Sequence, residues 1–258
     1  MNGVEYMLRD RSPRYSVAIH ICHYKLDSMT NTLLDDLLLQ NQIDSEVGVF
    51  LFDNGSPVPY TDGPIPAKTI YRVEKGLGLT GAFNESVRRS LDERDWALHW
   101  LLTNDVRLPN HETLPYLVNC FSEMTHVGAA QPAMPSFHEI LWPDRSKTVV
   151  DVPFLEWTAP ILSTYALLKV GFPDEELRFV GMDLDWSYRA RQAGFRLLVD
   201  HRAPVDHPYE GTWANCPELG HEYHKRHENE FAVLSQRYGP DYLNLLCGGR
   251  YGPKALWR

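Results

Sequence analysis

The chain has few cysteines and no long apolar run, and these two features argue against several classes of protein. Its four cysteines are scattered without a CxxC pair, which argues against a zinc module or a redox motif and fits reduced thiols. No stretch approaches the roughly 18 uninterrupted apolar residues of a membrane span, and residues 1–14 lack the apolar core of a signal peptide. We therefore expect a cytoplasmic protein without a transmembrane segment, and leave peripheral association with a membrane open.

Basic side chains are also scarce relative to acidic ones. The 258 residues include 25 Lys and Arg against 34 Asp and Glu, for a net charge of -9. A nucleic-acid partner would need a basic face for its phosphates, so we expect none. Apolar residues make up 43% of the chain and aromatic residues 12%, which is enough for a sizeable core in one domain or in one domain with an appendage.

Strand-like and helix-like segments alternate along the chain, a pattern typical of an α/β fold with a mostly parallel sheet and helices on its faces. The predicted strands are runs rich in β-branched and aromatic residues, at 15–22, 47–53, 69–73, 97–103, 127–130, 137–141, 148–152 and 157–162. Helices with apolar stripes are predicted at 29–38, 83–91 and 113–121, and the last third of the chain is predicted to be helical. We find no internal repeat and no linker that divides the chain.

Polar residues gather where two of the predicted strands end. Asp53-Asn54-Gly55-Ser56 follows the second strand, and Asn104-Asp105 stops the fourth. Carboxylates at strand ends lie where open α/β sheets bind ligands. For Asp53, an Asx turn that stabilises the bend at Asn54-Gly55 is the structural alternative.

A glycine-rich turn, Gly76-Leu77-Gly78-Leu79-Thr80-Gly81, lies between a predicted strand and a predicted helix. Taken alone, this GxGxxG pattern indicates a dinucleotide-binding Rossmann unit, and an NAD-dependent oxidoreductase is therefore one alternative function. In that fold the pattern commonly follows the first strand of its unit, whereas here another acidic strand end comes first. Tight turning and helix–strand packing explain the same glycines without a dinucleotide.

Residues 181–195 place two carboxylates at the start of an amphipathic helix that ends near Gly194. Asp185 precedes Arg189 by four residues, a spacing that predicts a surface ion pair on the first helical turn. Asp183 lies at the edge between loop and helix, where it can cap the helix or face a cleft as a base. Since residues i and i+2 do not share a helix face, only one carboxylate can point at a substrate, and Asp183 is the better candidate.

Four motifs in order, followed by a histidine, resemble those of the inverting GT-A glycosyltransferases of family 2, particularly the rhamnosyltransferase-like, non-processive members. The likeness covers about residues 15–215 and depends on the order and spacing of the motifs, which are Asp53-Asn54-Gly55-Ser56, 78–84, 101–105, 181–185 and His207. It implies a GT-A domain over residues 1–215 and a C-terminal helical extension, 216–258, packed on the same domain. The QxxRW signature of processive members is absent, which disfavours a polymerase.

The resemblance implies an enzyme, a hexosyltransferase that moves a sugar from a UDP-, GDP- or dTDP-sugar to a hydroxyl of a glycan or small-molecule acceptor. A divalent metal, Mn2+ or Mg2+, would sit on the donor diphosphate, held by Asp105 and His207. Asp183 would be the general base, and Asp185 would be the other catalytic carboxylate of its motif. The residues implied in nucleotide-sugar binding are His20, Tyr24, Asp53, Gly78, Asn84, Asn104 and Trp157.

The chain departs from the family pattern at three positions. The metal-binding DxD reads Thr103-Asn104-Asp105, so the first acidic position is missing and metal dependence is open. The Glu of the acidic pair before the base is Met182, and the Asn that usually precedes Leu-Gly is Gly76. A catalytically silent protein that binds sugar nucleotides is therefore a second alternative.

The predicted C-terminal helix, at about 218–237, is densely charged and carries three histidines. Phe231 and Leu234 mark its packing side. We interpret the histidine face as solvent-exposed, with contacts to a donor phosphate or to an acceptor as the alternative.

Overall fold

The computed structural model of the chain describes residues 15–40, 46–61, 69–134, 147–207, 212 and 215–249. Within these ranges one eight-stranded sheet has the order β3-β2-β1-β4-β7-β5-β8-β6. Its strands are β1 (Ser16–His23), β2 (Glu46–Asn54), β3 (Thr69–Val73), β4 (Leu98–Thr103), β5 (Val127–Ala133), β6 (Val149–Asp151), β7 (Ile161–Ser163) and β8 (Arg196–Pro204). The helices are α1 (Asp27–Leu38), α2 (Gly78–Glu93), α3 (Thr113–Glu123), α4 (Thr164–Val170), α5 (Met182–Gln192), α7 (Pro217–Tyr238) and α8 (Tyr242–Leu246). The strand predicted at 137–141 lies outside the described residues.

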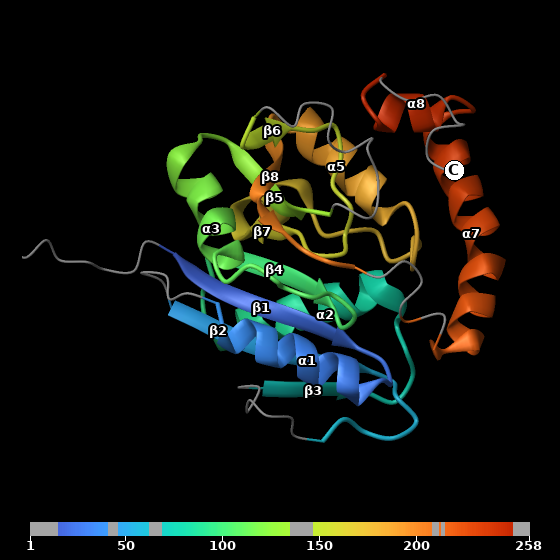
Figure 1. Ribbon diagram of the computed structural model, residues 1–258. Helices are drawn as coiled ribbons and strands as arrows, with labels where there is room; N and C mark the ends of the chain where they lie inside the picture. The colour runs from blue at the N-terminus through green and yellow to red at the C-terminus, as the bar shows by residue number, and fades with distance from the viewer. Residues whose placement is uncertain are drawn as a thin grey trace, which may run out of the picture.

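The half of the sheet that begins the chain is parallel. β1 pairs in parallel with β2 and with β4, and β2 pairs in parallel with β3. β5 and β8 are also parallel, whereas β7 runs antiparallel between β4 and β5, and β6 runs antiparallel to β8. The predicted α/β fold with a mostly parallel sheet flanked by helices is therefore confirmed, and Figure 1 shows α1 in front of the sheet and α2 behind it.

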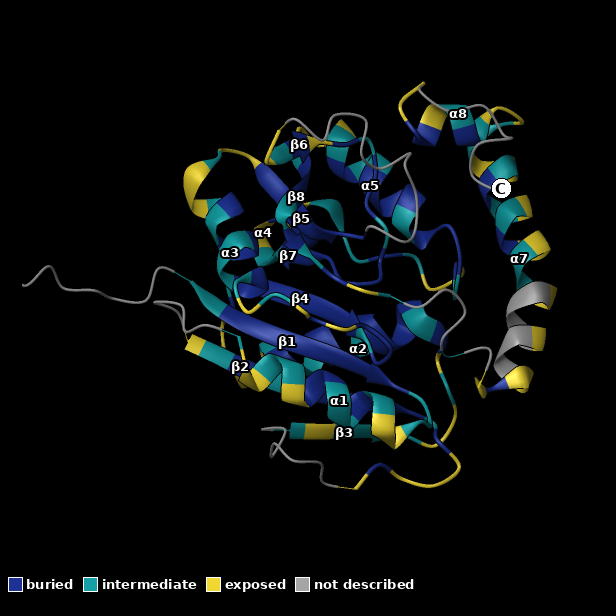
Figure 2. Ribbon diagram, viewed as in Figure 1, coloured by how far each residue is buried: buried dark blue, intermediate teal, exposed yellow. Residues whose placement is uncertain are grey.

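The central strands are covered on both faces, which explains their nearly continuous apolar sequences. Every residue of β1 after Ser16 is buried, and β4 is buried from Leu98 to Leu102. Figure 2 shows these two strands in the colour of buried residues. Because both strands are held from two sides, the polar residues at their carboxyl ends have fixed positions.

The helix that carries the two carboxylates begins and ends near the predicted residues. α5 starts directly after Gly181, whose backbone is left-handed with a φ of 77°, and it ends before Gly194, whose φ is 86°. α7 lies along one side of the body, and α8, which follows it, contacts α5 (Figure 1). None of the helices in the described ranges is both long enough and apolar enough to span a membrane.

Candidate active site

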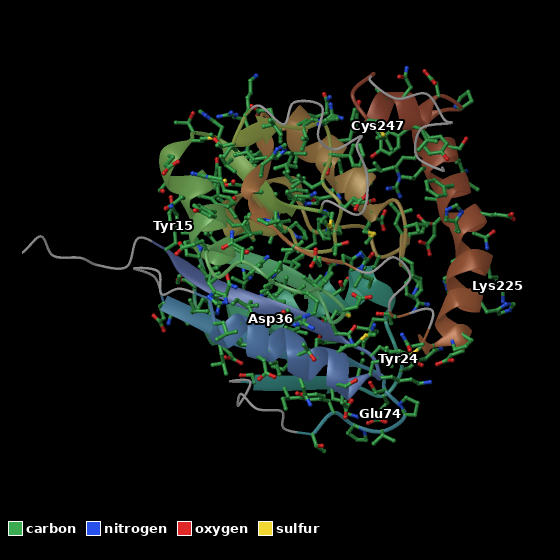
Figure 3. All side chains as sticks on the ribbon, viewed as in Figure 1. Tyr15, Tyr24, Asp36, Glu74, Lys225 and Cys247 are labelled. Carbon is green, nitrogen blue, oxygen red and sulfur yellow. The ribbon has the colours of Figure 1, made fainter. Side chains whose placement is uncertain are left out.

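A cavity of about 690 Å³ opens at the carboxyl edge of the parallel strands. Residues that end or follow β1, β2 and β4 line it, among them Tyr24, Asn54 and Asp105. Further lining comes from the segment 156–158, which precedes β7, and from the first turn of α5. Figure 3 labels Tyr24 and Glu74, which both belong to the lining. This is the edge at which open α/β sheets bind ligands.

The glycine-rich turn contributes to the cavity by packing against a segment that is distant in the sequence. Gly78 begins α2 with a φ of 80°, and a Cβ atom at this position would lie 2.9 Å from the carbonyl oxygen of Arg178. The Arg178 side chain donates to the carbonyls of Gly76 and Leu77, at 2.9 and 3.2 Å. Asn54, the last residue of β2, holds this turn with its side chain, which accepts the N–H of Leu77 at 2.8 Å and donates to the carbonyl of Gly78 at 3.1 Å. Close packing therefore requires the glycine, and the turn follows β3 rather than the first strand.

Asp105 and His207 meet just beyond the end of β4. Nε2 of His207 lies 3.3 Å from Oδ1 of Asp105, and Thr212 donates to Oδ2 from its backbone N–H at 3.1 Å and from its hydroxyl at 2.6 Å. Burial opposes ionisation of Asp105, but the hydrogen bonds from His207 and Thr212 and the charge of His207 outweigh it and lower the pKa of Asp105 to about 2. Asp105 is therefore ionised at neutral pH.

This pair fits a divalent cation that shares its ligands with a phosphate group. Mn2+ accepts carboxylate and imidazole ligands, and Mg2+ is commonly held by one or two carboxylates together with substrate phosphates and water. Across the described ranges, no group of three or more His, Cys, Asp or Glu residues converges on a metal position. Asp105 and His207 would therefore supply two ligands, and the other positions would be left for a diphosphate and water.

Besides Asp105 and Glu74, two further carboxyl groups line the same cavity. Asp183 lies in the first turn of α5, where its Oδ1 accepts the N–H of Leu184 at 2.8 Å. Burial raises the pKa of Asp183 to about 6, although backbone hydrogen bonds oppose the shift. Glu156 has a pKa raised well above its usual value, by burial and then by the charge of Asp183. The cavity thus contains one carboxyl that exchanges its proton near neutral pH and a second that holds its proton more strongly.

Asp185 does not line the cavity and is fully buried. It pairs with Arg189 at 2.8 Å, as the spacing of four residues predicts. It also accepts from Nη1 of Arg237 at 2.8 Å and from the hydroxyl of Tyr238 at 2.7 Å. The predicted surface location is therefore wrong, although the predicted ion pair forms. The reason is that α7, which supplies Arg237 and Tyr238, covers this side of α5.

Two residues implied in nucleotide binding are instead part of the interior. His20 is buried in β1, where Nδ1 lies 2.8 Å from Oγ of Ser86 and Nε2 lies 3.0 Å from Nδ1 of His99. Asn84 is buried in α2 and donates to the carbonyl of Pro173 at 2.8 Å. Neither residue lines the cavity. Both hold elements that surround it.

Asp53 is also not among the residues that line the cavity. Its carboxylate accepts the backbone N–H of Ser56 at 2.9 Å and that of Tyr60 at 3.1 Å, and it receives a hydrogen bond from Arg72. Arg72 stands beside Asp53 in the register of β2 and β3. The bond to Ser56 is the Asx-type turn that the sequence allowed as the structural alternative.

The cavity brings together seven of the predicted site residues, which are Tyr24, Gly78, Asn104, Asp105, Trp157, Asp183 and His207. Trp157 is almost fully buried, with its ring packed edge-on against Trp186 at 5.7 Å. Sequence reasoning missed Glu156. The signal that could have found it is its position directly before Trp157, in the segment that resembles the acceptor-facing part of the family.

No family model and no curated protein matches the sequence. Among solved structures, the chain is similar to GalNAc-T7 with UDP, GalNAc and Mn2+, at 13% identity and a TM-score of 0.55, over 75% of this chain and 44% of that one. It is similar to the mannosyltransferase PcManGT from Pyrobaculum calidifontis in complex with GDP-Man and Mn2+, at 18% identity and a TM-score of 0.56, over 79% and 61%. It is also similar to S. aureus TarS, at 16% identity and a TM-score of 0.55, over 74% and 36%.

These likenesses show that the chain has a GT-A-type fold. The chain spans less than two thirds of the length of each of these proteins, between 36% and 61%. Membership of family 2, and of its rhamnosyltransferase-like group, stays a prediction.

Proposed function

We propose that the chain is an inverting glycosyltransferase that moves a sugar from a nucleoside-diphosphate donor to an acceptor hydroxyl. One observation carries the proposal. A single cavity holds the ionised Asp105 with His207 and, separately, Asp183 with a pKa of about 6. Sugar transfer needs both parts, since a leaving diphosphate requires positive charge and an attacking hydroxyl requires a base. The UDP, GDP-Man and Mn2+ of the similar structures support the same assignment.

The donor is proposed to bind along Tyr24, Gly78 and Asn104, with its diphosphate toward Asp105 and His207. Those two residues would hold Mn2+ or Mg2+, which when bound would stabilise the charge that develops on the leaving diphosphate. Lys75 and Arg226 also belong to the cavity lining and bring positive charge from the protein itself. His20, Asp53 and Asn84 are proposed to support this side indirectly, through the elements they hold.

Asp183 is the proposed general base. The acceptor oxygen forms a bond to the anomeric carbon, the bond from that carbon to the diphosphate oxygen breaks with its electron pair, and the acceptor proton passes to Asp183. One displacement from the opposite face inverts the configuration. A base with a pKa near the working pH is both largely deprotonated and still basic, which is the state that burial gives Asp183.

Glu156 and Trp157 are proposed to form the acceptor side beside the base. The charge of Asp183 favours the protonated form of Glu156, and a protonated carboxyl can donate a hydrogen bond to a sugar hydroxyl. Trp157 is too deeply buried to offer its whole ring to a ligand. Its proposed role is therefore to shape the wall that carries Glu156.

A donor screen tests the function. UDP, GDP, dTDP and NAD are each added with and without Mn2+, and the shift in melting temperature is measured, because binding to the folded state raises apparent stability. We expect one nucleoside diphosphate to stabilise the protein, more strongly with Mn2+, and its nucleotide sugar to release free nucleotide on incubation. Stabilisation by NAD alone would favour the oxidoreductase, and binding of a donor without release would favour a silent binding protein.

A further inference from the structure

The C-terminal helix α7 presents a stripe of four side chains to the body of the protein. Arg226, Glu230, Leu234 and Arg237 are four, four and three residues apart, so they share one helix face. Arg226 lines the cavity, and the other three contact the segment that leads into α5. Figure 3 shows Lys225, on a different face of α7, pointing away from the body.

Glu230 binds the backbone just before the proposed base. Its side chain is 3% exposed, and Oε2 accepts the N–H groups of Phe179 and Val180, both at 2.9 Å. Within the described ranges the other oxygen, Oε1, makes no hydrogen bond. Hydrogen bonds from N–H groups to a carboxylate are among the stronger ones in proteins. The two amides are thus the hydrogen-bond partners that the structure gives this buried carboxylate, which holds two consecutive peptide units in place.

The next residue in the chain, Gly181, is pressed against the same helix. Its φ is 77°, and a Cβ atom on it would lie only 2.6 Å from Cδ1 of Leu234. Gly181 is directly followed by Met182 and Asp183, which both line the cavity. The path of the backbone between the amides held by Glu230 and the first turn of α5 therefore sets the direction of the Asp183 side chain.

Asp185 fixes the other end of this contact. Its buried carboxylate receives Arg237 and Tyr238 from the last turn of α7. The two carboxylates of the motif therefore divide the work: Asp183 faces the cavity, and Asp185 ties α5 to the helix that carries Glu230.

We propose that Glu230 is a positioning residue for Asp183 and that α7 is thereby part of the catalytic unit rather than an accessory to it. By holding the amides of Phe179 and Val180, Glu230 fixes the turn that aims Asp183 into the cavity. The proposal rests on the proposed role of Asp183 as the base. Its test is therefore chosen to give a result even if no transfer is found.

The test is a pH titration of the Asp183 carboxyl. NMR monitors the titration in protein labelled with 13C at the aspartate carboxyls, and the signal of Asp183 is identified by its loss in Asp183→Asn. The groups that face Asp183 are Glu156, Cys247 and, across the cavity, His207 and Arg226. Glu156 holds its proton more strongly, and burial raises the pKa of the Cys247 thiol to about 12. Neither Glu156 nor Cys247 therefore accounts for a midpoint near 6 in the carboxyl signal of Asp183.

In Glu230→Ala we expect this midpoint to fall by about one unit or more, towards the roughly 4 of an exposed aspartate, because a loosened turn lets water reach the carboxyl. Hydrogen exchange at the amides of Phe179 and Val180 should become at least about tenfold faster, since their acceptor is lost. Glu230→Gln keeps an acceptor oxygen and should stay close to the wild type. Glu228→Ala, an exposed glutamate on the same helix, is the matched control and should change neither quantity.

A folded Glu230→Ala protein with an unchanged midpoint and unchanged exchange would overturn the proposal. If that variant does not fold, Glu230→Asp is used in its place, because it keeps the charge but is one methylene shorter. An unchanged midpoint of Asp183 in Glu230→Asp would likewise overturn the proposal. Where nucleotide release is measurable, kcat should fall about tenfold or more in Glu230→Ala with KM for the donor unchanged. Absence of release in the wild type would count against the proposed function but would leave the titration result for Glu230 standing.

Discussion

Two carboxylates have opposite surroundings: Asp53, which does not line the cavity, and Asp183, which does. On the side of β2 and α2, Asp53 is enclosed by two backbone N–H groups and Arg72. On the side of α5, Asp183 forms no ion pair with any described residue, and burial raises its pKa to about 6. A residue that is fully satisfied inside the fold stabilises the fold, whereas a carboxyl kept in a cavity with a raised pKa is available for chemistry.

The same contrast occurs within a single helical turn. Asp183 and Asp185 are two residues apart, so the helix turns them to different sides. Asp185 is neutralised by Arg189 and Arg237 in the interior, and Asp183 lines the cavity. We therefore expect substitution of one to affect transfer and substitution of the other to affect stability.

The largest effect is expected for Asp183→Asn. This change removes the basic oxygen but keeps the size of the side chain, so release of nucleotide from the donor should fall by at least about 100-fold. Donor affinity, measured by calorimetry, should stay within about twofold of the wild type. Full transfer activity in this variant would show that Asp183 is not the base. The proposed difference in function between Asp183 and Asp185 would then be wrong.

Asp185→Asn should give the complementary result. Three hydrogen bonds to a buried carboxylate are weakened, so the free energy of unfolding should fall by about 2 kcal/mol, which lowers Tm by roughly 4–8 °C in a chain of this size. Asp174→Asn is the matched control, because Asp174 also pairs with Arg237 but is partly exposed, and it should cost about 1 kcal/mol or less. A loss of transfer without a loss of stability would instead give the base role to Asp185.

Asp105→Ala tests the donor side. With Mn2+ present, affinity for the nucleoside diphosphate should fall by about tenfold or more, since one of the two proposed protein ligands to the cation is lost. With a chelator present, the variant and the wild type should bind alike. Asp206→Ala, an exposed neighbour, is the control. Equal losses of affinity with Mn2+ and with a chelator would show that Asp105 has a structural role, like the one that the structure indicates for Asp53.

The smallest effect is expected for Asp53→Asn, which tests whether Asp53 stabilises the fold rather than binds the nucleotide. Asp53→Asn weakens the pair with Arg72 and the Asx-type turn, so it should lower the free energy of unfolding by about 1 kcal/mol and leave nucleotide affinity nearly unchanged. Chemical denaturation and calorimetry measure the two quantities. Weaker nucleotide binding at normal stability would show that Asp53 contacts the donor, as the family resemblance implies.

The sequence was most informative where the signal is local. Runs of β-branched residues located the strands of the parallel half, and Gly194 marked the end of α5 within a residue or two. The strand ends also located the cavity, because parallel strands bring their carboxyl ends to one edge.

It was least informative where the answer depends on a neighbour that is distant in the chain. Arg72 meets Asp53 only through the register of β2 and β3, and Glu230 meets Phe179 only because α7 packs beside α5. Apolar periodicity finds the packing side of α7 through Leu234, but a buried glutamate on that side looks like any other charge of a solvated helix. Glu156 was missed for the same reason, since its burial comes from tertiary packing.

The pH dependence of nucleotide release tests the central claim, that Asp183 is the base, most directly. A base must lose its proton to act, and burial raises the pKa of Asp183 to about 6. In the wild type the rate should therefore rise as the pH passes upward through about 6 and level off above it, while Asp183→Asn should show a low rate without this inflection. A wild-type rate that is constant between about pH 5 and pH 7, or an inflection that survives in Asp183→Asn, would contradict the account.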